Sequence, residues 1–180
     1  MGIVSSFNPV DTYSGLAIEP EVSDKTIHDV VFYLQTLKAP LQRNQNDAQV
    51  MAGKSLFIEI GCGKCHKETL KTGISSIQAL SNQVFHPYTD LLLHDMGGSL
   101  DDGYTEGTAI TSEWRTPALW GLGLSKSSQG NGYFLMHDGR ARSIQDAIIM
   151  HDGEGKSSKN RFLELSDLDK SRLIKFLESL

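Results

Sequence analysis

The segment GCGKCHKETL, residues 61–70, holds both cysteines of the 180-residue chain. Cys62 and Cys65 stand three positions apart, and His66 follows the second cysteine directly. Three kinds of site use two cysteines at this spacing: a thiol–disulfide redox pair, a structural zinc site and the attachment site of a c-type haem. The residues around the segment help to distinguish among them.

A covalent haem accounts for every element of the motif. A redox pair usually sits in a strand-to-helix turn of a βαβ unit, and the flanking sequence shows no such pattern. A structural zinc ion needs about four ligands, so it would have to recruit nearby histidines in addition to Cys62 and Cys65. In the haem interpretation both thiols form thioethers and His66 binds the iron. The motif therefore favours one covalent haem c, and a zinc-stabilised binding module using Cys62, Cys65 and nearby histidines is the alternative.

Amphipathic patterns on both sides of the motif predict helices. Ser23 is a helix N-cap, and apolar residues recur at helical spacing after it until Pro40 ends the helix. Further helices are predicted over residues 48–60, over residues 143–151, and from Ser166 to the C-terminus, where Asp169 completes a capping box. No segment alternates cleanly between apolar and polar residues, so we expect no sheet.

Two of these helices carry the residues that a close helix crossing requires. Gly53 and Phe57 lie one turn apart before the CxxCH motif, and Phe176 with Leu177 lie on the last helix. A small residue allows the two backbones to approach, and the aromatic side chains fill the space beside it. The predicted fold class is therefore all-α, a class I cytochrome c-like domain with long irregular loops.

The composition excludes several classes of function. Hydrophobic residues make up 39% of the chain and charged residues 22%, which is typical of a globular core. The net charge of −5 argues against a nucleic-acid-binding protein. No apolar run approaches the roughly 20 residues that a membrane-spanning helix needs. We therefore expect neither a nucleic-acid partner nor a membrane span.

An internal similarity bears on domain organisation. VVFYLQTL (30–37) and LIKFLESL (173–180) align without gaps and share their apolar positions, although only one CxxCH motif lies between them. Residues 1–41 are therefore interpreted as the tail and closing helix of a preceding cytochrome c domain, and residues 42–180 as the C-terminal cytochrome c domain. Covalent haem is attached outside the bacterial cytoplasm, whereas the first residues do not resemble a signal peptide. We expect a periplasmic or otherwise exported protein whose leader lies outside this sequence.

Several longer segments carry a family resemblance. They are GKSLFIEIGCGKCH, PYTDLLLHDMGGSLDDG, EWRTPALWGLG, FLMHDGRARSIQDAI and MHDGEG, in this order. Together, over about residues 24–180, they resemble the C-terminal part of the di-haem oxidoreductase family, which is related to bacterial di-haem cytochrome c peroxidases. The resemblance implies two haem domains in the whole protein. One haem reacts with peroxide, and the other relays electrons to it from a redox partner protein.

The resemblance also bears on the second axial ligand of the iron. The segment DAIIMH (146–151) matches the end of the family helix that carries this ligand, and the register places His151 at the ligand position. Met96, in HDMG, is the rival, because cytochromes often take a methionine from a loop. Two histidine ligands would leave no open coordination position on the iron, so this domain would transfer electrons and have no peroxide site of its own. Arg115, beside Trp114, is a candidate for pairing with a haem propionate.

Overall fold

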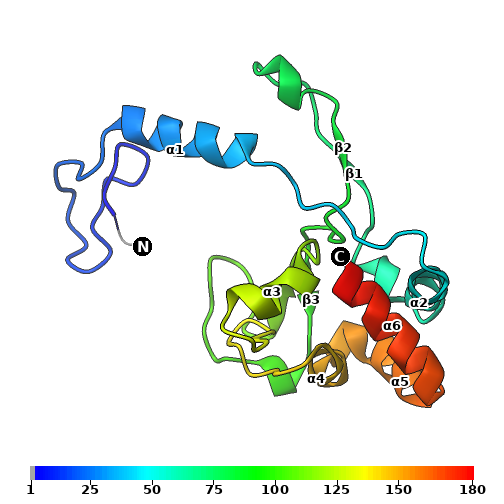
Figure 1. Cartoon of the computed structure of the whole chain (residues 1–180). Coiled ribbons are helices and arrows are strands. Elements are labelled where there is room, and N and C mark those ends of the chain that lie inside the picture. The colour runs from blue at the N-terminus through cyan, green and yellow to red at the C-terminus, as the bar shows by residue number, and fades with distance from the viewer. Residues whose placement is uncertain (1–2) are drawn as a thin grey trace. The chain divides into compact units, whose positions relative to one another are not determined.

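The computed structural model describes residues 3–180 and divides the chain into two compact units (Figure 1). One unit contains the chain up to Lys38 together with Thr72–Gln83, and the other contains Ala39–Lys71 and Val84–Leu180. Within residues 3–180, no helix combines the length and the apolar character that crossing a membrane would require.

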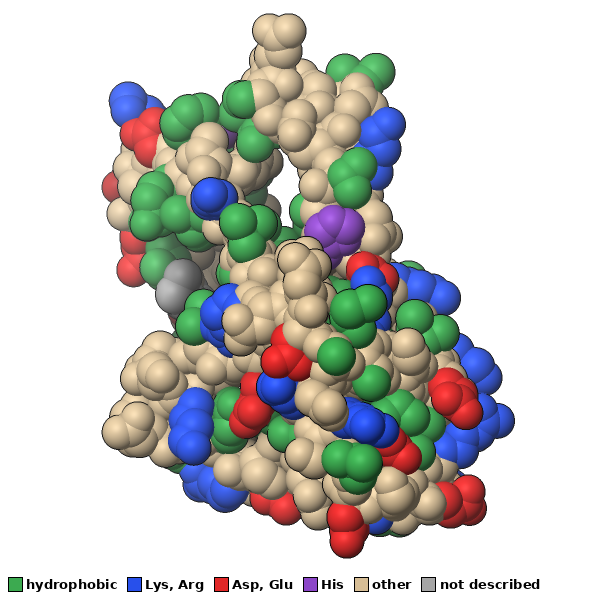
Figure 2. Space-filling model, turned by 45° about the vertical axis from the view of Figure 1, so that its right-hand side comes forward, with side chains coloured by type: hydrophobic (Ala, Val, Ile, Leu, Met, Phe, Trp, Pro, Cys, Tyr) green, Lys and Arg blue, Asp and Glu red, His purple; other side chains and the backbone are tan. Residues whose placement is uncertain are grey.

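Helix α1, Asp24–Thr36, is the main element of the first unit and begins where the sequence predicts. The Ser23 hydroxyl accepts a hydrogen bond from the Thr26 N–H at 3.2 Å, which satisfies a free donor of the first turn. None of the α1 residues is buried, and apolar side chains such as Val30 and Leu34 lie on the surface. Hydrophobic side chains at the surface appear green in Figure 2. Val30 and Leu34 are each at least two-fifths exposed, where the amphipathic pattern would bury them.

A short hairpin follows the CxxCH motif. Strand β1, Leu70–Lys71, pairs antiparallel with β2, Val84–Phe85. The ladder continues into the hairpin tip, where the Thr72 N–H donates to the Gln83 carbonyl at 2.9 Å. The tip itself contains the 3-10 turn η2, Gln78–Leu80.

A second antiparallel pair joins β3, Leu93–Asp95, to β4, Glu113–Arg115. The expectation of no sheet was therefore wrong. Strands of two or three residues are too short to show an alternating pattern, and their pairing depends on partners far away in the sequence. Over residues 3–180 the chain is predominantly helical with two small sheets, so the all-α expectation holds only in part.

The second unit is organised by two helices. Helix α2, Ala48–Glu59, packs along α6, Asp167–Ser179, as the sequence predicts. A Cβ atom at Gly53 would overlap the Arg172 carbonyl oxygen and would come within 2.7 Å of the Phe176 Cβ. Only glycine therefore permits this approach of the two backbones.

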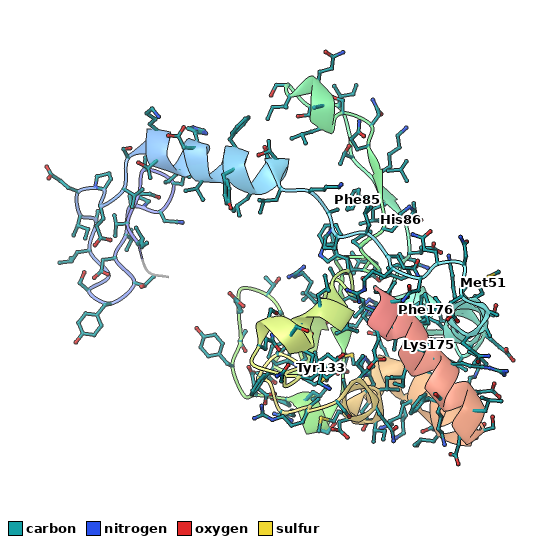
Figure 3. The ribbon with its side chains drawn as sticks, viewed as in Figure 1. Met51, Phe85, His86, Tyr133, Lys175 and Phe176 are labelled. Atoms are coloured by element: carbon teal, nitrogen blue, oxygen red, sulfur yellow. The ribbon has the colours of Figure 1, made fainter. Side chains whose placement is uncertain are left out.

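Aromatic rings fill the space around this crossing. Phe176 is fully buried on α6 (Figure 3), and its ring centroid lies 5.3 Å from that of Phe57. Tyr88 contacts both rings, at 6.0 and 5.8 Å between centroids. The cluster continues through further buried residues of the second unit: Val50, Ile60, Tyr133, Ile144, Phe162, Leu173, Leu177 and Leu180. This core holds the last turn of α2, from which the CxxCH motif follows.

Three shorter helices complete the second unit: α3, Leu122–Ser128, α4, Ile144–Met150, and α5, Lys156–Glu164. Helix α4 was predicted with its cap, and the Ser143 hydroxyl accepts from the Asp146 N–H at 3.0 Å. Helices α3 and α5 were not predicted. The glycines after α4 form the 3-10 turn η4, Gly153–Gly155, and α5 begins immediately after it.

The crossing gives a direct test of the packing. Gly53→Ala should lower the free energy of unfolding by roughly 1–3 kcal/mol, because the new methyl group overlaps the Arg172 carbonyl. This is opposite in sign to the gain that Ala usually gives over Gly in a helix, about 1 kcal/mol. Urea unfolding measures the difference. The matched control is Gly98→Ala, where a Cβ meets nothing within 4 Å. Equal stability of Gly53→Ala and wild type would contradict the packing.

Candidate haem-binding site

The CxxCH motif forms a tight turn at the end of α2. Gly61 has a φ of +98°, a left-handed conformation that ends the helix and favours glycine. The 3-10 turn η1, Cys62–Lys64, follows, and the His66 N–H donates to the Cys62 carbonyl at 3.0 Å. Both thiols are free, partly buried and held on one short turn with His66. This donor set fits a covalently attached haem.

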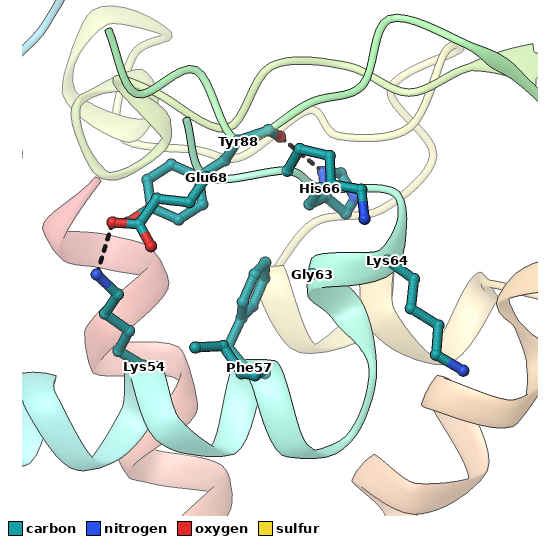
Figure 4. A pocket seen from close by; sticks show the side chains of 9 residues that line it. Lys54, Phe57, Gly63, Lys64, His66, Glu68 and Tyr88 are labelled. Atoms are coloured by element: carbon teal, nitrogen blue, oxygen red, sulfur yellow. Dashed lines mark hydrogen bonds and ion pairs between the residues drawn. The ribbon is translucent and has the colours of Figure 1, made fainter. Parts of the chain in front are cut away.

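The imidazole of His66 is oriented by a backbone carbonyl (Figure 4). Its Nδ1 lies 3.0 Å from the carbonyl oxygen of Tyr88. A carbonyl only accepts, so Nδ1 carries the proton and Nε2 keeps a free lone pair, the form that binds a metal. Burial is the largest cause that lowers the pKa of His66, to about 4. His66 is therefore neutral at physiological pH.

Burial also governs the two thiols. It raises the pKa of Cys62 to about 12, and it raises the pKa of Cys65 as well. Thiols in such surroundings stay protonated at neutral pH and are poor nucleophiles. This is the opposite of the activated thiolate that a thiol–disulfide redox pair requires, so the burial of the two thiols does not favour that kind of site.

A pocket of about 260 Å³ lies beside His66. Phe57 and Ile58 contribute apolar side chains, while Lys54 and Glu68 form an ion pair across it at 2.6 Å (Figure 4). Lys64 and Lys67 also line it, so the pocket carries more positive than negative charge.

His151 resembles His66 in the way its ring is held. It caps the C-terminus of α4, and its Nδ1 lies 2.7 Å from the carbonyl oxygen of Ala147. Nε2 is again left with a free lone pair. Burial is the first cause that lowers the pKa of His151, and the His151 imidazole in turn contributes to lowering the pKa of His66. His66 and His151 are thus both neutral and have the same tautomer.

His94 is held differently. Its Nδ1 lies 2.9 Å from a carboxylate oxygen of Glu154, and its Nε2 lies 3.0 Å from a carboxylate oxygen of Asp90. Because carboxylates only accept, both nitrogens must carry protons. The bond to Glu154 is the largest cause that raises the pKa of His94. His94 therefore has no lone pair to offer to a metal in this arrangement.

His137 lies against an aromatic side chain. Its ring stacks on Trp114 with 4.1 Å between centroids and 17° between planes. Trp114 in turn donates its indole N–H to the Leu100 carbonyl at 2.8 Å. The neighbouring HDGR turn is a structural clamp, because Arg140 binds both the Asp138 carboxylate, at 2.6 Å, and the Ser99 carbonyl, at 3.0 Å.

Met96 lies beside His151. A Cβ atom at Gly155 would be 3.2 Å from the His151 Cδ2 and 3.4 Å from the Met96 Cε. The two rival candidates for the second axial position therefore flank the same glycine. Arg115 is exposed on β4 opposite Leu93, and its pairing with a propionate stays a prediction.

Cys65 has neighbours that the sequence did not reveal. Its Sγ lies 3.8 Å from the His94 Nδ1, and one ligand atom each of Cys65, Asp90 and His94 lie within 4.8 Å of one another. Cys62 is not in this group. The group therefore gives no added support to the zinc alternative, which needs both cysteines as ligands. The only sequence signal for the group is Asp90 and His94 at a spacing of four, which is common in proteins.

The second unit is thus a predominantly helical structure with a CxxCH turn and two oriented, neutral imidazoles. Residues 4–180 match the family described as "Di-haem oxidoreductase, putative peroxidase", and the chain belongs to this family. The match confirms the family resemblance seen in the sequence. It also supports a haem cofactor and a haem-based redox function.

Among solved structures, the chain is similar to Kuenenia stuttgartiensis hydrazine synthase, with a TM-score of 0.55 and 17% sequence identity. The similarity covers 93% of this chain and 59% of that chain, so the present sequence spans about three-fifths of the length of its structural neighbour. At this level of identity the similarity concerns the fold alone. No curated protein matches the chain.

The carboxylates around His94 generate a testable pH dependence. Asp90→Asn should lower the pKa of His94 toward its ordinary value of about 6.5, because it removes one of the two charges that stabilise the imidazolium. Since the folded-state pKa is raised, this stabilisation is complete below about pH 6.5 and is lost as the pH rises through the folded-state pKa. The destabilisation caused by Asp90→Asn should therefore be larger in mild acid than in alkali.

NMR titration of the imidazole measures the pKa of His94, and urea unfolding at both pH values measures the stability. Asp138→Asn is the matched control, because this exposed carboxylate pairs with Arg140 and should leave His94 unchanged. A wild-type His94 that titrates at or below its ordinary value would contradict the arrangement.

Proposed function

We propose that this chain is a c-type haem electron-transfer domain of a di-haem, peroxidase-like oxidoreductase. Cys62 and Cys65 would attach one haem, and His66 and His151 would be its axial ligands. The observation that carries the proposal is the hydrogen bonding of the two imidazoles, each of which gives Nδ1 to a backbone carbonyl and keeps Nε2 free. Bound there, a haem supplies one-electron redox chemistry.

The chain's own residues would set the properties of this site. The carbonyls of Tyr88 and Ala147 fix the tautomer and the ring orientation of the two histidines and increase their basicity as ligands. Burial keeps both rings neutral, so neither has to lose a proton before it binds a metal. Arg115 would neutralise a propionate. The proposed fold of this domain is that of a class I cytochrome c.

Two occupied axial positions would restrict the domain to electron transfer. Peroxide would react at a second haem domain of the same protein, which the family description implies. A separate redox partner protein would supply the electrons, and the protein would work in the periplasm or another exported location. On its own, this domain would show no peroxidase turnover.

The first 41 residues would belong to that second haem domain. Helix α1 shares its apolar pattern with α6, yet the burial of the matched positions is opposite. Val30 and Leu34 are 50% and 58% exposed, whereas their matches Leu173 and Leu177 are 0% and 5% exposed. In α6 this face packs against α2. We expect the matching face of α1 to pack in the same way, as the closing helix of another cytochrome domain.

Covalent haem is the property to test first. Protein exported from a bacterium that matures c-type cytochromes should keep its Soret absorption in the protein fraction after acid–acetone extraction. Cys62→Ala/Cys65→Ala should release the haem into the acetone. A colourless wild-type protein that contains stoichiometric zinc would instead favour the zinc-stabilised module.

The identity of the second axial ligand is tested by exchange. His151→Met should raise the reduction potential by roughly 100 mV or more, because axial ligands tune haem potentials over about 0.8 V and methionine raises them relative to histidine. Met96→Leu is the matched control, since the side chain lies beside His151 and should leave the potential unchanged. Potentiometric titration measures both variants. A shift in Met96→Leu without one in His151→Met would assign the position to Met96.

A further inference from the structure

Three turns of the chain share the pattern His-Asp-x-Gly or His-Asp-Gly: residues 94–97, 137–139 and 151–153. Each ends in a glycine with positive φ, at +78° for Gly97, +73° for Gly139 and +51° for Gly153. The first and third turns pack directly on each other. A Cβ atom at Gly153 would overlap the Asp95 carbonyl oxygen and would lie 2.7 Å from the Gly97 nitrogen. The backbone that carries Met96 therefore lies against the backbone that follows His151.

Glu154 connects these two turns through both of its carboxylate oxygens. Oε2 accepts from the His94 Nδ1 at 2.9 Å, and Oε1 accepts from the Asp95 N–H at 3.0 Å. A carboxylate that bridges a side chain and a backbone N–H restrains both groups at once, and bonds to a charged partner are the stronger ones. Glu154 therefore restrains the loop just before Met96.

The bridge continues toward the attachment site. The other nitrogen of His94 binds Asp90 at 3.0 Å, and the Cys65 Sγ lies 3.8 Å from the His94 Nδ1. Asp90, His94 and Glu154 thus form a row of charged groups that runs from the CxxCH turn to η4. The proposed axial ligation of the iron uses neither His94 nor Glu154.

Both candidates for the second axial position lie next to one end of this row. The His151 ring and the Met96 Cε lie against Gly155, one residue after Glu154. Methionine has a flexible, unbranched side chain that adapts to small movements of its backbone. A loop released from Glu154 would therefore allow Met96 to compete with His151.

We infer that Glu154 is a positioning residue that selects His151 over Met96 as the second axial ligand. It acts through its hydrogen bonds to the His94 ring and the Asp95 N–H. The inference rests on the proposed haem function and adds a determinant of ligand choice to it.

Glu154→Ala tests the inference in the exported, haem-containing protein. It removes both hydrogen bonds, so the ferric protein should gain the red charge-transfer band of methionine ligation, and its reduction potential should rise. The double variant Glu154→Ala/Met96→Leu should lose the band again. Glu154→Gln keeps an acceptor for the Asp95 N–H but not the charge, and it should give a smaller band. Glu164→Ala, an exposed glutamate at the end of α5, is the matched control and should leave the spectrum unchanged.

The outcomes separate this inference from the proposed function. A wild-type spectrum and potential in Glu154→Ala would overturn the inference and leave the covalent haem intact. If Glu154→Ala does not fold and Glu154→Gln has the wild-type spectrum, Glu154 is a structural residue only and the inference is also overturned. A wild-type protein without covalent haem would overturn the proposed function, and the inference with it.

Discussion

The approach of α2 to α6 at Gly53 is the contact on which the second unit depends. Because Gly53 has no side chain, the backbone at Arg172 and the Phe176 side chain lie directly against it. This closeness brings Phe57 onto Phe176 and Tyr88, and it thereby fixes the last turn of α2. The CxxCH turn begins there, so its position follows from the packing of α2 on α6. The same Tyr88 supplies the carbonyl that orients His66, which links the core directly to the ligand.

Hydrogen bonding distinguishes the histidines near this turn from one another. His66 and His151 each donate a hydrogen bond from Nδ1 to a backbone carbonyl, which leaves Nε2 free to bind a metal. His94 is bound by carboxylates at both nitrogens, and His137 is stacked on Trp114. Three of them are followed by an aspartate, and two of these occur in an identical Met-His-Asp-Gly context. Their different chemistry arises from the partners that the fold brings to each ring.

Features with local causes were predictable from the sequence. The caps at Ser23, Ser143 and Ser166 each fix a helix start through a hydrogen bond within three residues, and all three helices begin there. The family resemblance was likewise confirmed.

The pairing of 93–95 with 113–115 was not predictable, because it depends on a partner some twenty residues away. Helix α5 was missed because its residues are mostly polar and its N-cap, Gly155, has no side chain that could mark the helix start. The role of Glu154 also depends on contacts across sixty residues of sequence.

The account depends most on the covalent attachment of one haem through both cysteines, with the neighbouring imidazole on the iron. Mass spectrometry of the exported protein under denaturing conditions tests this most directly. The account predicts a chain heavier by the mass of one haem, with the addition mapped to the peptide that contains Cys62 and Cys65. An unmodified mass, with both cysteines open to alkylation after unfolding, would contradict it.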